Sequence, residues 1–583
     1  MFRKNEDHRQ GDLFSHMLLG LTEAKYKRAI SSKEYIFYEE VFCRIDEGIF
    51  EPLFAGGRGR PNAPLNSMVA AMILREVRHC TYEQLFRNLD FDVLTRMAVG
   101  LTDMSETPFC PATLFNFQER LVRYEQDQGS NLFEQLFHSI TGDLLERFEV
   151  DAGIQRSDSF AAMSNIANYG RVRLLVEVLL RLYRVLEVTD REKVDSILKP
   201  YTSQSSDNYV YRMDPADLPR ELSQLAGIYI RIFQLLGKNY AEDPVYQMFE
   251  RVMAEQFEVG DDDDVRVRTP KEIGSNSLQS PDDPEATFNA KNGKRQKGYK
   301  VNVAETATPE NALNLINDVA VAPNNVSDGT MLADRMDTIK QHTPRLDEMH
   351  TDGGYGGGAL DPKMSEHEVL HVETGTKMGH ARVNMIYETA DDSYRVSCPS
   401  QTALAERTSK RWKAVFNDEI CRSCSHREHC PTVQHPRKRT LYFDESWAKA
   451  SIRSRNIERI PEERWKLRAN VEATVKEFTG CFNHKGKLRV RGLERSTLQI
   501  LAAALAINFG RVFRYQNRDT TPCTPQPNYQ SACPAAGVSL WGLLSAVLAL
   551  LRPILEKMAQ NHPGNELGPK SPYYLSTAVL RTA

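Results

Sequence analysis

A basic stretch near the C-terminal end of the chain reads Arg464-Trp465-Lys466-Leu467-Arg468-Ala469-Asn470-Val471-Glu472-Ala473-Thr474. Its pattern predicts a helix with one carboxylate, Glu472, on the same stripe as Trp465 and Arg468, because residues three, four and seven apart share a helix face. A glutamate on a basic helix is most often a solvated surface residue in an ion pair. Its meaning therefore depends on two aspartates that lie far upstream.

The first of these aspartates, Asp158, follows a predicted strand with apolar residues at Val150 and Ile154. We expect Asp158 at the carboxyl end of this strand, where α/β sheets gather their ligands. A turn or helix-cap role for Asp158 is the alternative. Asp151 is a competing acid, but it comes too early in the strand.

The second aspartate, Asp352, ends another predicted strand in Thr351-Asp352-Gly353-Gly354-Tyr355. The glycine pair lets the backbone turn sharply and leaves Asp352 exposed at the strand tip. An ordinary turn is the alternative, since Asp-Gly is a common turn signal. Between the two aspartates, residues 298–305 and 313–322 predict paired strands, and Thr330 to His342 predicts a helix.

Composition bounds the class of protein. A chain of 583 residues exceeds what one core serves, so two to four domains are expected. The formal charge of -4 argues against a uniformly basic nucleic-acid binder. Lys291 to Lys300, Arg437 to Arg439 and Lys485 to Arg495 still provide local basic segments, and the second could follow a DNA backbone. Without a signal peptide or an apolar run of about 18 residues, a cytoplasmic protein without membrane contact is expected.

Four cysteines predict a structural zinc site. They are Cys398, Cys421, Cys424 and Cys430, and their C-x2-C and C-x5-C spacing, with a fourth thiol from the preceding strand, matches tetrahedral Zn²⁺. His426 or His429 could replace one thiol, and chance clustering is the other alternative. The remaining six cysteines are scattered and are expected to be buried or incidental.

The segments suggest five parts. We expect a helical N-terminal DNA-binding domain over 1–147, and an α/β core from 148–165, 285–380 and 455–515. A helical insertion with a flexible acidic linker fills 166–284, a cysteine-rich insertion fills 381–454, and a tail follows over 516–583. In the first part, a capped helix is expected from Thr81, and the segment from Thr107 to Leu114 is expected to open a further helix. Short helices and a basic loop suit a helix-turn-helix bundle, and they suit other bundles equally well.

The order of these segments resembles the DDE transposases of bacterial insertion sequences. The resemblance rests on Arg156 to Ser159, on Gly298 to Val301 with Pro323-Asn324-Asn325 to Asp328, on Thr351 to Tyr355, and on Arg468-x-x-x-Glu472-x-Thr474 followed by Arg491-Gly492-Leu493. No single motif is specific, but their order and combination are. The resemblance implies an α/β fold: a ribonuclease H-like mixed sheet, split by a helical insertion and a zinc-stapled insertion, behind a helical N-terminal domain.

The same resemblance implies a metal-dependent enzyme that cuts the ends of its element and joins the 3′-hydroxyl strands to target DNA. Asp158, Asp352 and Glu472 would be catalytic and hold Mg²⁺ or Mn²⁺, with Asp158 bridging two ions. Its partners would be double-stranded DNA, at the element ends and the target site, and a second copy of the chain, because two ends must be paired. The protein would then act at the bacterial nucleoid.

Arg468, Trp465 and Arg491 are the DNA contacts that the resemblance implies. Pairing of Arg468 with Glu472 and a core position for Trp465 remain alternatives. The chain also departs from the family pattern. Related helices often carry tyrosine where Trp465 stands, and one version of the motif has a basic residue where Thr479 stands, so no lysine is assigned a catalytic role.

Two other functions fit the same sequence. One is a site-specific nuclease or resolvase on the same fold. The other is a non-catalytic DNA-binding protein derived from a transposase. Only a transposase joins 3′ ends to target DNA, so strand-transfer products separate it from the nuclease. Replacement of Asp352 by Asn should abolish the activity of a transposase and leave that of a non-catalytic DNA-binding protein unchanged.

Overall fold

The computed structural model describes residues 1–6, 21–55, 59–104, 106–211, 213–237, 239–260, 265–291, 293–373, 385–390, 392–458, 461, 464, 467 and 471–518. Trp465, Arg468 and the expected tail beyond Arg518 therefore lie outside the described residues.

The N-terminal part is helical, as predicted. Its elements are α2 Glu23–Ile30, α3 Lys33–Glu40, η3 Phe42–Arg44, η4 Glu47–Leu53, α4 Leu65–Val77, α5 Tyr82–Phe91, α6 Val93–Ala98, α7 Pro111–Gln128 and α8 Leu132–Arg147. The capped start at Thr81 is confirmed, because the Thr81 hydroxyl accepts from the Gln84 amide while the Gln84 side chain accepts from the Thr81 amide. Helix α7 begins at Pro111, where the fixed φ of proline favours a first helical residue.

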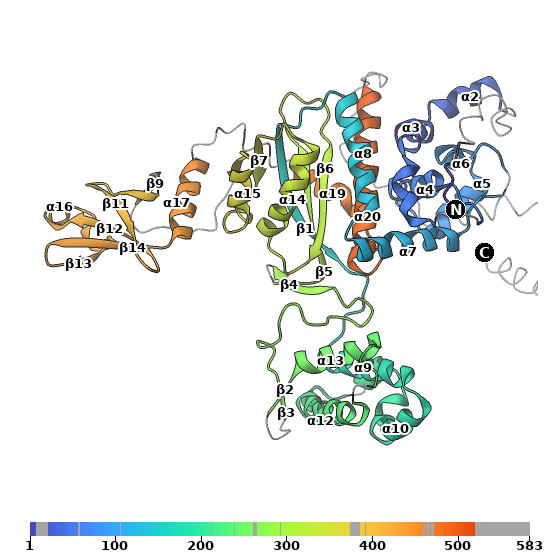
Figure 1. Cartoon of the computed structure of the whole chain (residues 1–583), viewed down its shortest axis with the longest axis horizontal. Helices are drawn as coiled ribbons and strands as arrows, with labels where there is room; N and C mark the ends of the chain where they lie inside the picture. The colour runs from blue at the N-terminus through green and yellow to red at the C-terminus, as the bar shows by residue number, and fades with distance from the viewer. Residues whose placement is uncertain are drawn as a thin grey trace, which may run out of the picture. The chain divides into compact units, whose positions relative to one another are not determined.

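A six-stranded mixed sheet forms the centre of the fold. Its strands are β1 Ile154–Met163, β4 Thr287–Lys291, β5 Lys294–Thr306, β6 Ile316–Pro323, β7 Glu348–Thr351 and β8 Leu370–Glu373. The order is β4-β5-β1-β7-β8, with β6 also paired to β5 (Figure 1). Strand β1 runs antiparallel to β5 and parallel to β7, so the predicted α/β class with a mixed sheet is confirmed.

Strand β1 differs from its predicted extent. It begins at Ile154 and continues to Met163, so Asp158 lies in the middle of the strand and not at its carboxyl end. The reason is the long antiparallel partner β5, which pairs with every residue from Gln155 to Met163. Pairing with the short parallel strand β7 covers only Ile154 to Arg156.

Helices pack on this sheet, some in a core shared with the N-terminal part and others in a separate apolar cluster with β5 and β7. They are α14 Asp328–His342, α15 Leu360–Glu366, α19 Val471–Phe478, η7 Thr479–Cys481 and α20 Leu493–Gln516. Helix α20 contacts α4, α8 and β6, and its side chain Asn508 both donates to and accepts from the backbone of Ile316 at 2.8 Å (Figure 1). This helix is long and apolar enough to cross a membrane, but 72% of its apolar window is buried. Its apolar composition is therefore explained by packing in the protein core.

The first insertion is helical, as predicted. It contains α9 Arg171–Val185, α10 Val188–Thr202, α11 Ser206–Tyr211, η5 Pro215–Asp217, α12 Leu218–Leu236, α13 Pro244–Gln256 and the hairpin of β2 Phe257–Val259 and β3 Val265–Val267. The segment that was expected to be a flexible linker is packed against the rest of the chain in its described residues. Leu278 is buried in the core of the insertion, and buried Asp283 accepts hydrogen bonds from Ser164 and from Tyr299. These contacts tie the segment to the sheet despite its polar composition.

The second insertion carries its own antiparallel sheet. Its elements are β9 Ile386–Ala390, β10 Ser393–Ser397, β11 Thr402–Arg407, β12 Trp412–Asn417, α16 Asp418–Arg422, η6 Arg427–His429, β13 Val433–His435, β14 Lys438–Phe443 and α17 Glu445–Glu458. The strand order is β13-β14-β12-β11-β10-β9. A separate apolar cluster that includes Trp412, Phe416 and Leu441 fills its interior.

Candidate active site

Asp158 lies within β1, and Asp352 lies just beyond the end of its parallel neighbour β7. The register pairs Arg156 with His350, so two residues further on Asp158 is level with Asp352, which directly follows β7. Both side chains are half-buried. Residues two apart on a strand share a face, so Phe160 lies on the same side of β1 as Asp158.

The turn after β7 orients the Asp352 carboxylate. The Gly354 amide donates to Asp352 Oδ1 at 2.7 Å, and the Tyr355 amide donates to the Asp352 carbonyl at 3.2 Å. A Cβ at Gly354 would lie 2.8 Å from Asp352 Oδ1. A Cβ here would therefore crowd the carboxylate, which is a further reason for glycine at the turn that the sequence indicated.

Glu472 lies in the first turn of α19, and its side chain is exposed. This helix packs on β1, where the rings of Phe478 and Phe160 are 5.4 Å apart. Since Phe160 shares a strand face with Asp158, the helix that carries Glu472 lies on the face of β1 that carries Asp158.

A buried ion-pair network holds α19 in this position. Its centre is Glu305 on β5, which is fully buried and accepts from Arg156 Nε at 2.7 Å, Arg511 Nη1 at 2.6 Å and Thr474 Oγ1 at 2.7 Å. Burial raises the pKa of Glu305, but the charges of Arg511 and Arg156 outweigh it and lower the pKa overall. Arg156 also donates to the Leu467 carbonyl at 2.7 Å. The network thus joins β1, β5, α20 and both ends of the segment around Glu472.

The structure adds a fourth acid that the sequence analysis did not assign. Asp328, the first residue of α14, accepts from Ser159 Oγ at 2.8 Å and pairs with Lys300 Nζ at 2.7 Å. A Cβ at Gly354 would be 3.3 Å from Asp328 Oδ2 and 2.8 Å from Asp352 Oδ1, so the two carboxylates are near neighbours. The sequence feature that could have pointed to Asp328 is the segment from Asn324 to Asp328. This segment supported the family resemblance, but none of its residues was assigned a role.

Tyr355 lies beneath these acids. It is 1% exposed, and its hydroxyl donates to Asn302 Oδ1 at 2.6 Å. Burial, followed by the charges of Asp158 and Asp328, raises the pKa of Tyr355 well above its usual value. Tyr355 is therefore a neutral hydrogen-bond donor that supports the floor of the site.

Arg491 has a partner within the chain. Its Nε donates to the Asn165 carbonyl at 2.8 Å, and its Nη1 lies 3.8 Å from Asp282, while about half of the side chain is exposed. The basic segment 437–439 was expected to follow a DNA backbone. Arg439 does not fit this expectation, because it is buried and donates to Thr432. Arg437 and Lys438 are exposed.

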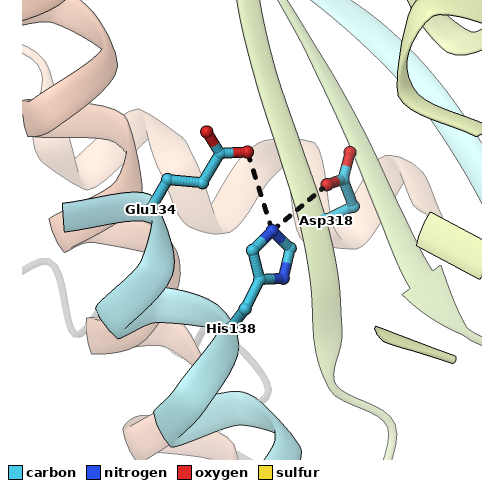
Figure 2. A group of neighbouring side chains, drawn as sticks. All are labelled: Glu134, His138 and Asp318. Carbon is cyan, nitrogen blue, oxygen red and sulfur yellow. Dashed lines mark ion pairs between the residues drawn. The ribbon is translucent and has the colours of Figure 1, made fainter. Parts of the chain in front are cut away.

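A second group of acids lies elsewhere, between α8 and β6. Figure 2 shows Glu134 and His138 from α8 facing Asp318 from β6, and one potential ligand atom from each lies within 4.8 Å of the others. His138 Nε2 is 3.6 Å from Glu134 Oε1 and 3.8 Å from Asp318 Oδ1. The sequence analysis did not identify this group, because Glu134 and His138 are four residues apart on one helix but Asp318 is distant in the chain.

Arg335 from α14 already neutralises both carboxylates of this group. Its guanidinium donates to Asp318 at 2.6 and 3.1 Å and also binds Glu134. Burial raises the pKa of Glu134, but hydrogen bonding from His138 and the charge of Arg335 lower it overall. We therefore interpret the group as an ion-pair cluster that fastens α8 to the sheet.

The four predicted zinc ligands lie in one region of the second insertion. Gln401, three residues after Cys398, donates through its side chain to Cys421 Sγ at 3.0 Å, and Ser400 Oγ donates to Cys424 Sγ at 3.3 Å. Burial raises the pKa of the Cys421 thiol, and the neighbouring thiols Cys398, Cys430 and Cys424 add to this. The other three cysteines are therefore neighbours of Cys421, and a structural Zn²⁺ site here stays a prediction.

Two protein-family models match parts of the chain. A family model described as a transposase DDE domain matches residues 393–513, a range that contains Glu472. A second model, described as a transposase domain (DUF772), matches residues 25–120. Together the two matches support a DDE transposase of insertion-sequence type.

The two matches differ in what they cover in this transposase. The first spans the second insertion from β10, the glutamate helix and most of α20, and the second spans α2 to α7 apart from its last turns. Neither range includes Asp158 or Asp352, whose assignment therefore rests on the strand register. None of the curated proteins compared with the chain matches it.

Proposed function

We propose that this transposase cleaves DNA at the ends of its element and joins the freed 3′-hydroxyl strands to target DNA. The observation that supports this most directly is the register of β1 and β7, which sets Asp158 level with Asp352 while the helix of Glu472 packs on the same strand. The proposal includes a ribonuclease H-like description of the core and a dimer that pairs two element ends in the bacterial cytoplasm.

The three carboxylates fit a hard divalent metal. They offer only oxygen donors, as Mg²⁺ or Mn²⁺ prefers, and the exposed Glu472 leaves one side open to DNA. When bound, two such ions would activate the attacking oxygen and stabilise the leaving one. Asp158 would hold both ions, and Asp352 and Glu472 would each hold one.

The neighbouring residues would orient these acids. The Ser159 amide donates to Asp158 Oδ1 at 2.8 Å, as the Gly354 amide does to Asp352. Glu305 and Thr474 would position Glu472 by fixing α19 on the sheet. The zinc-stapled insertion would support the same segment from the other end, because α17 leads directly into it.

Incubation of the full chain with pre-cut DNA from the flanks of its gene, a target plasmid and Mg²⁺ tests the proposal. We expect joined 3′ ends. Asp352→Asn should lower joining at least about a thousandfold, equivalent to ~4 kcal/mol in the barrier, whereas Asp334→Asn, at an exposed position on α14, should join normally. Cleavage without joining would indicate a nuclease, and full activity in Asp352→Asn would contradict the assignment.

A further inference from the structure

An ion pair at the start of β7 joins this strand to the segment that leads into the glutamate helix α19. Arg464 Nη1 donates to both Oε1 and Oε2 of Glu348 at 2.5 Å. The Glu348 side chain is 10% exposed, whereas the Arg464 side chain is 44% exposed. An ion pair between two exposed side chains contributes little, but a buried carboxylate that accepts through both oxygens holds its partner more firmly.

Glu348 is itself held in place within the sheet. It is the first residue of β7, and its Oε1 lies 2.6 Å from Nε2 of His350, which is fully buried. Residues two apart share a strand face, so Glu348 and His350 lie on the side of β7 that continues to Asp352. Glu348 therefore gives Arg464 a fixed anchor on the strand that leads into a proposed metal ligand.

Two further contacts fasten the same segment to neighbouring strands. Arg156 of β1 donates to the Leu467 carbonyl at 2.7 Å, and Glu305 of β5 accepts from Thr474 at 2.7 Å. Arg156 lies opposite both Glu305 and the β7 residue that binds Glu348, so the three contacts lie on one face of the sheet. Of these three anchors, Glu348 is the one on the strand that ends directly before the second aspartate.

We propose that Glu348 and Arg464 are positioning residues whose ion pair fixes where Glu472 lies relative to Asp352. The inference rests on the proposed function, because it takes these two carboxylates to belong to one metal site. Glu472 follows Arg464 closely in the chain, and its own side chain is exposed, so packing does not fix it. A displacement of about 1 Å at a reacting centre lowers a rate by as much as roughly a hundredfold.

Three measurements on the full chain test the proposal. They are the rate of 3′-end joining at saturating element-end DNA, the affinity for that DNA, and the affinity for Mn²⁺ followed by electron paramagnetic resonance. Glu348→Gln and Arg464→Ala should each lower the joining rate and the Mn²⁺ affinity about tenfold, as loss of one charge-assisted hydrogen bond predicts, and leave the DNA affinity unchanged. The double variant should lose no more than either single variant, because both changes remove the same ion pair.

Two further variants separate positioning from a general loss of structure. Arg464→Lys keeps the positive charge and should recover most of the joining rate and of the Mn²⁺ affinity. Arg266→Ala is the matched control, since Arg266 is also half-exposed and pairs with two carboxylates, Glu258 and Glu272, in the first insertion. It should keep the wild-type values in all three measurements.

Wild-type joining and Mn²⁺ affinity in Arg464→Ala would overturn the positioning role, and so would additive losses in the double variant. A loss of DNA affinity that matches the loss of joining would also overturn it, because Arg464 would then act on DNA. Each of these results would leave the proposed function standing. If the wild-type chain joins no 3′ ends, the proposed function fails, and the Mn²⁺ affinities still decide whether the ion pair positions a metal ligand.

Discussion

Glu305 is the residue on which the position of the glutamate helix depends most. Its two oxygens bind Arg156 on β1, Arg511 on α20 and Thr474 on α19, and no water reaches it. A buried carboxylate between two guanidinium groups is not a large source of stability in itself. Loss of one member is costly, however, because the others remain buried without charge compensation.

Glu305→Gln should therefore lower the free energy of unfolding by about 3–5 kcal/mol. Glu477→Gln is the matched control, since Glu477 pairs with Arg511 and Arg514 from a side chain that is 30% exposed and should cost no more than about 1 kcal/mol. Denaturant titration of the two variants measures both values. Equal losses would show that the buried network has no special role.

His350 gives the fold a dependence on pH. It is fully buried on β7, and burial lowers the pKa of its imidazole below the usual 6.5. Because the unfolded chain takes up this proton first, stability is complete above about pH 6.5 and falls as the pH drops below it. We expect His350→Gln to flatten this fall by up to about 1.4 kcal/mol per pH unit. Unfolding free energies measured from pH 5 to 8 would show it, and an unchanged slope would contradict it.

At the scale of elements, the sequence predicted whether a segment is a helix or a strand better than it predicted where that helix or strand ends. Alternating and helical spacing correctly indicated β5, β6 and α14, and the cap at Thr81 marked a helix start. The extent of β1 was missed because strand length is set by its partner β5, which local pattern does not reveal. Asp328 was missed because only the fold brings it close to Asp352, at the turn of Gly354.

Gly298 is required for the pairing of β5 with its neighbouring strands, which the sequence motif alone did not explain. It has φ +143°, and a Cβ there would lie 2.4 Å from the Ser164 amide nitrogen and 2.5 Å from the Ala162 carbonyl oxygen, where β5 passes from β4 to β1. Gly298→Ala should cost at least about 2 kcal/mol of unfolding free energy. Gly227→Ala, inside α12 with open space around it, should gain up to about 1 kcal/mol. Melting temperatures that fall for Gly298→Ala and rise for Gly227→Ala would support this prediction. Equal shifts of the two melting temperatures would contradict it.

At the scale of the whole molecule, the helical N-terminal part and part of the mixed sheet share one apolar core. Helices α14 and α15 pack with the sheet in a second core, and each insertion has a core of its own. The first insertion lies in the sequence between Asp158 and Asp352, and the second lies between Asp352 and Glu472. Three carboxylates from residues 158, 352 and 472 can form one site only if both insertions fold without disturbing the sheet between them. The second insertion is small, so a metal is a reasonable source of its stability.

We expect the purified chain to contain one zinc ion, which elemental analysis would measure. Cys424→Ser should lower the zinc content and expose the second insertion to proteolysis, because a structural site loses much of its affinity with one thiolate. Cys110→Ser is the control, since Cys110 is an exposed cysteine at the start of α7 and should keep the full zinc content. A zinc-free wild-type chain with a protease-resistant insertion would contradict the prediction.

The central claim is that Asp158, Asp352 and Glu472 form one metal site. Titration of the full chain with Mn²⁺, followed by electron paramagnetic resonance in the presence of element-end DNA, tests it most directly. The account predicts that Asp158→Asn, Asp352→Asn and Glu472→Gln each weaken Mn²⁺ binding about tenfold or more while DNA binding persists. Wild-type Mn²⁺ affinity in Glu472→Gln, or in either aspartate variant, would contradict it.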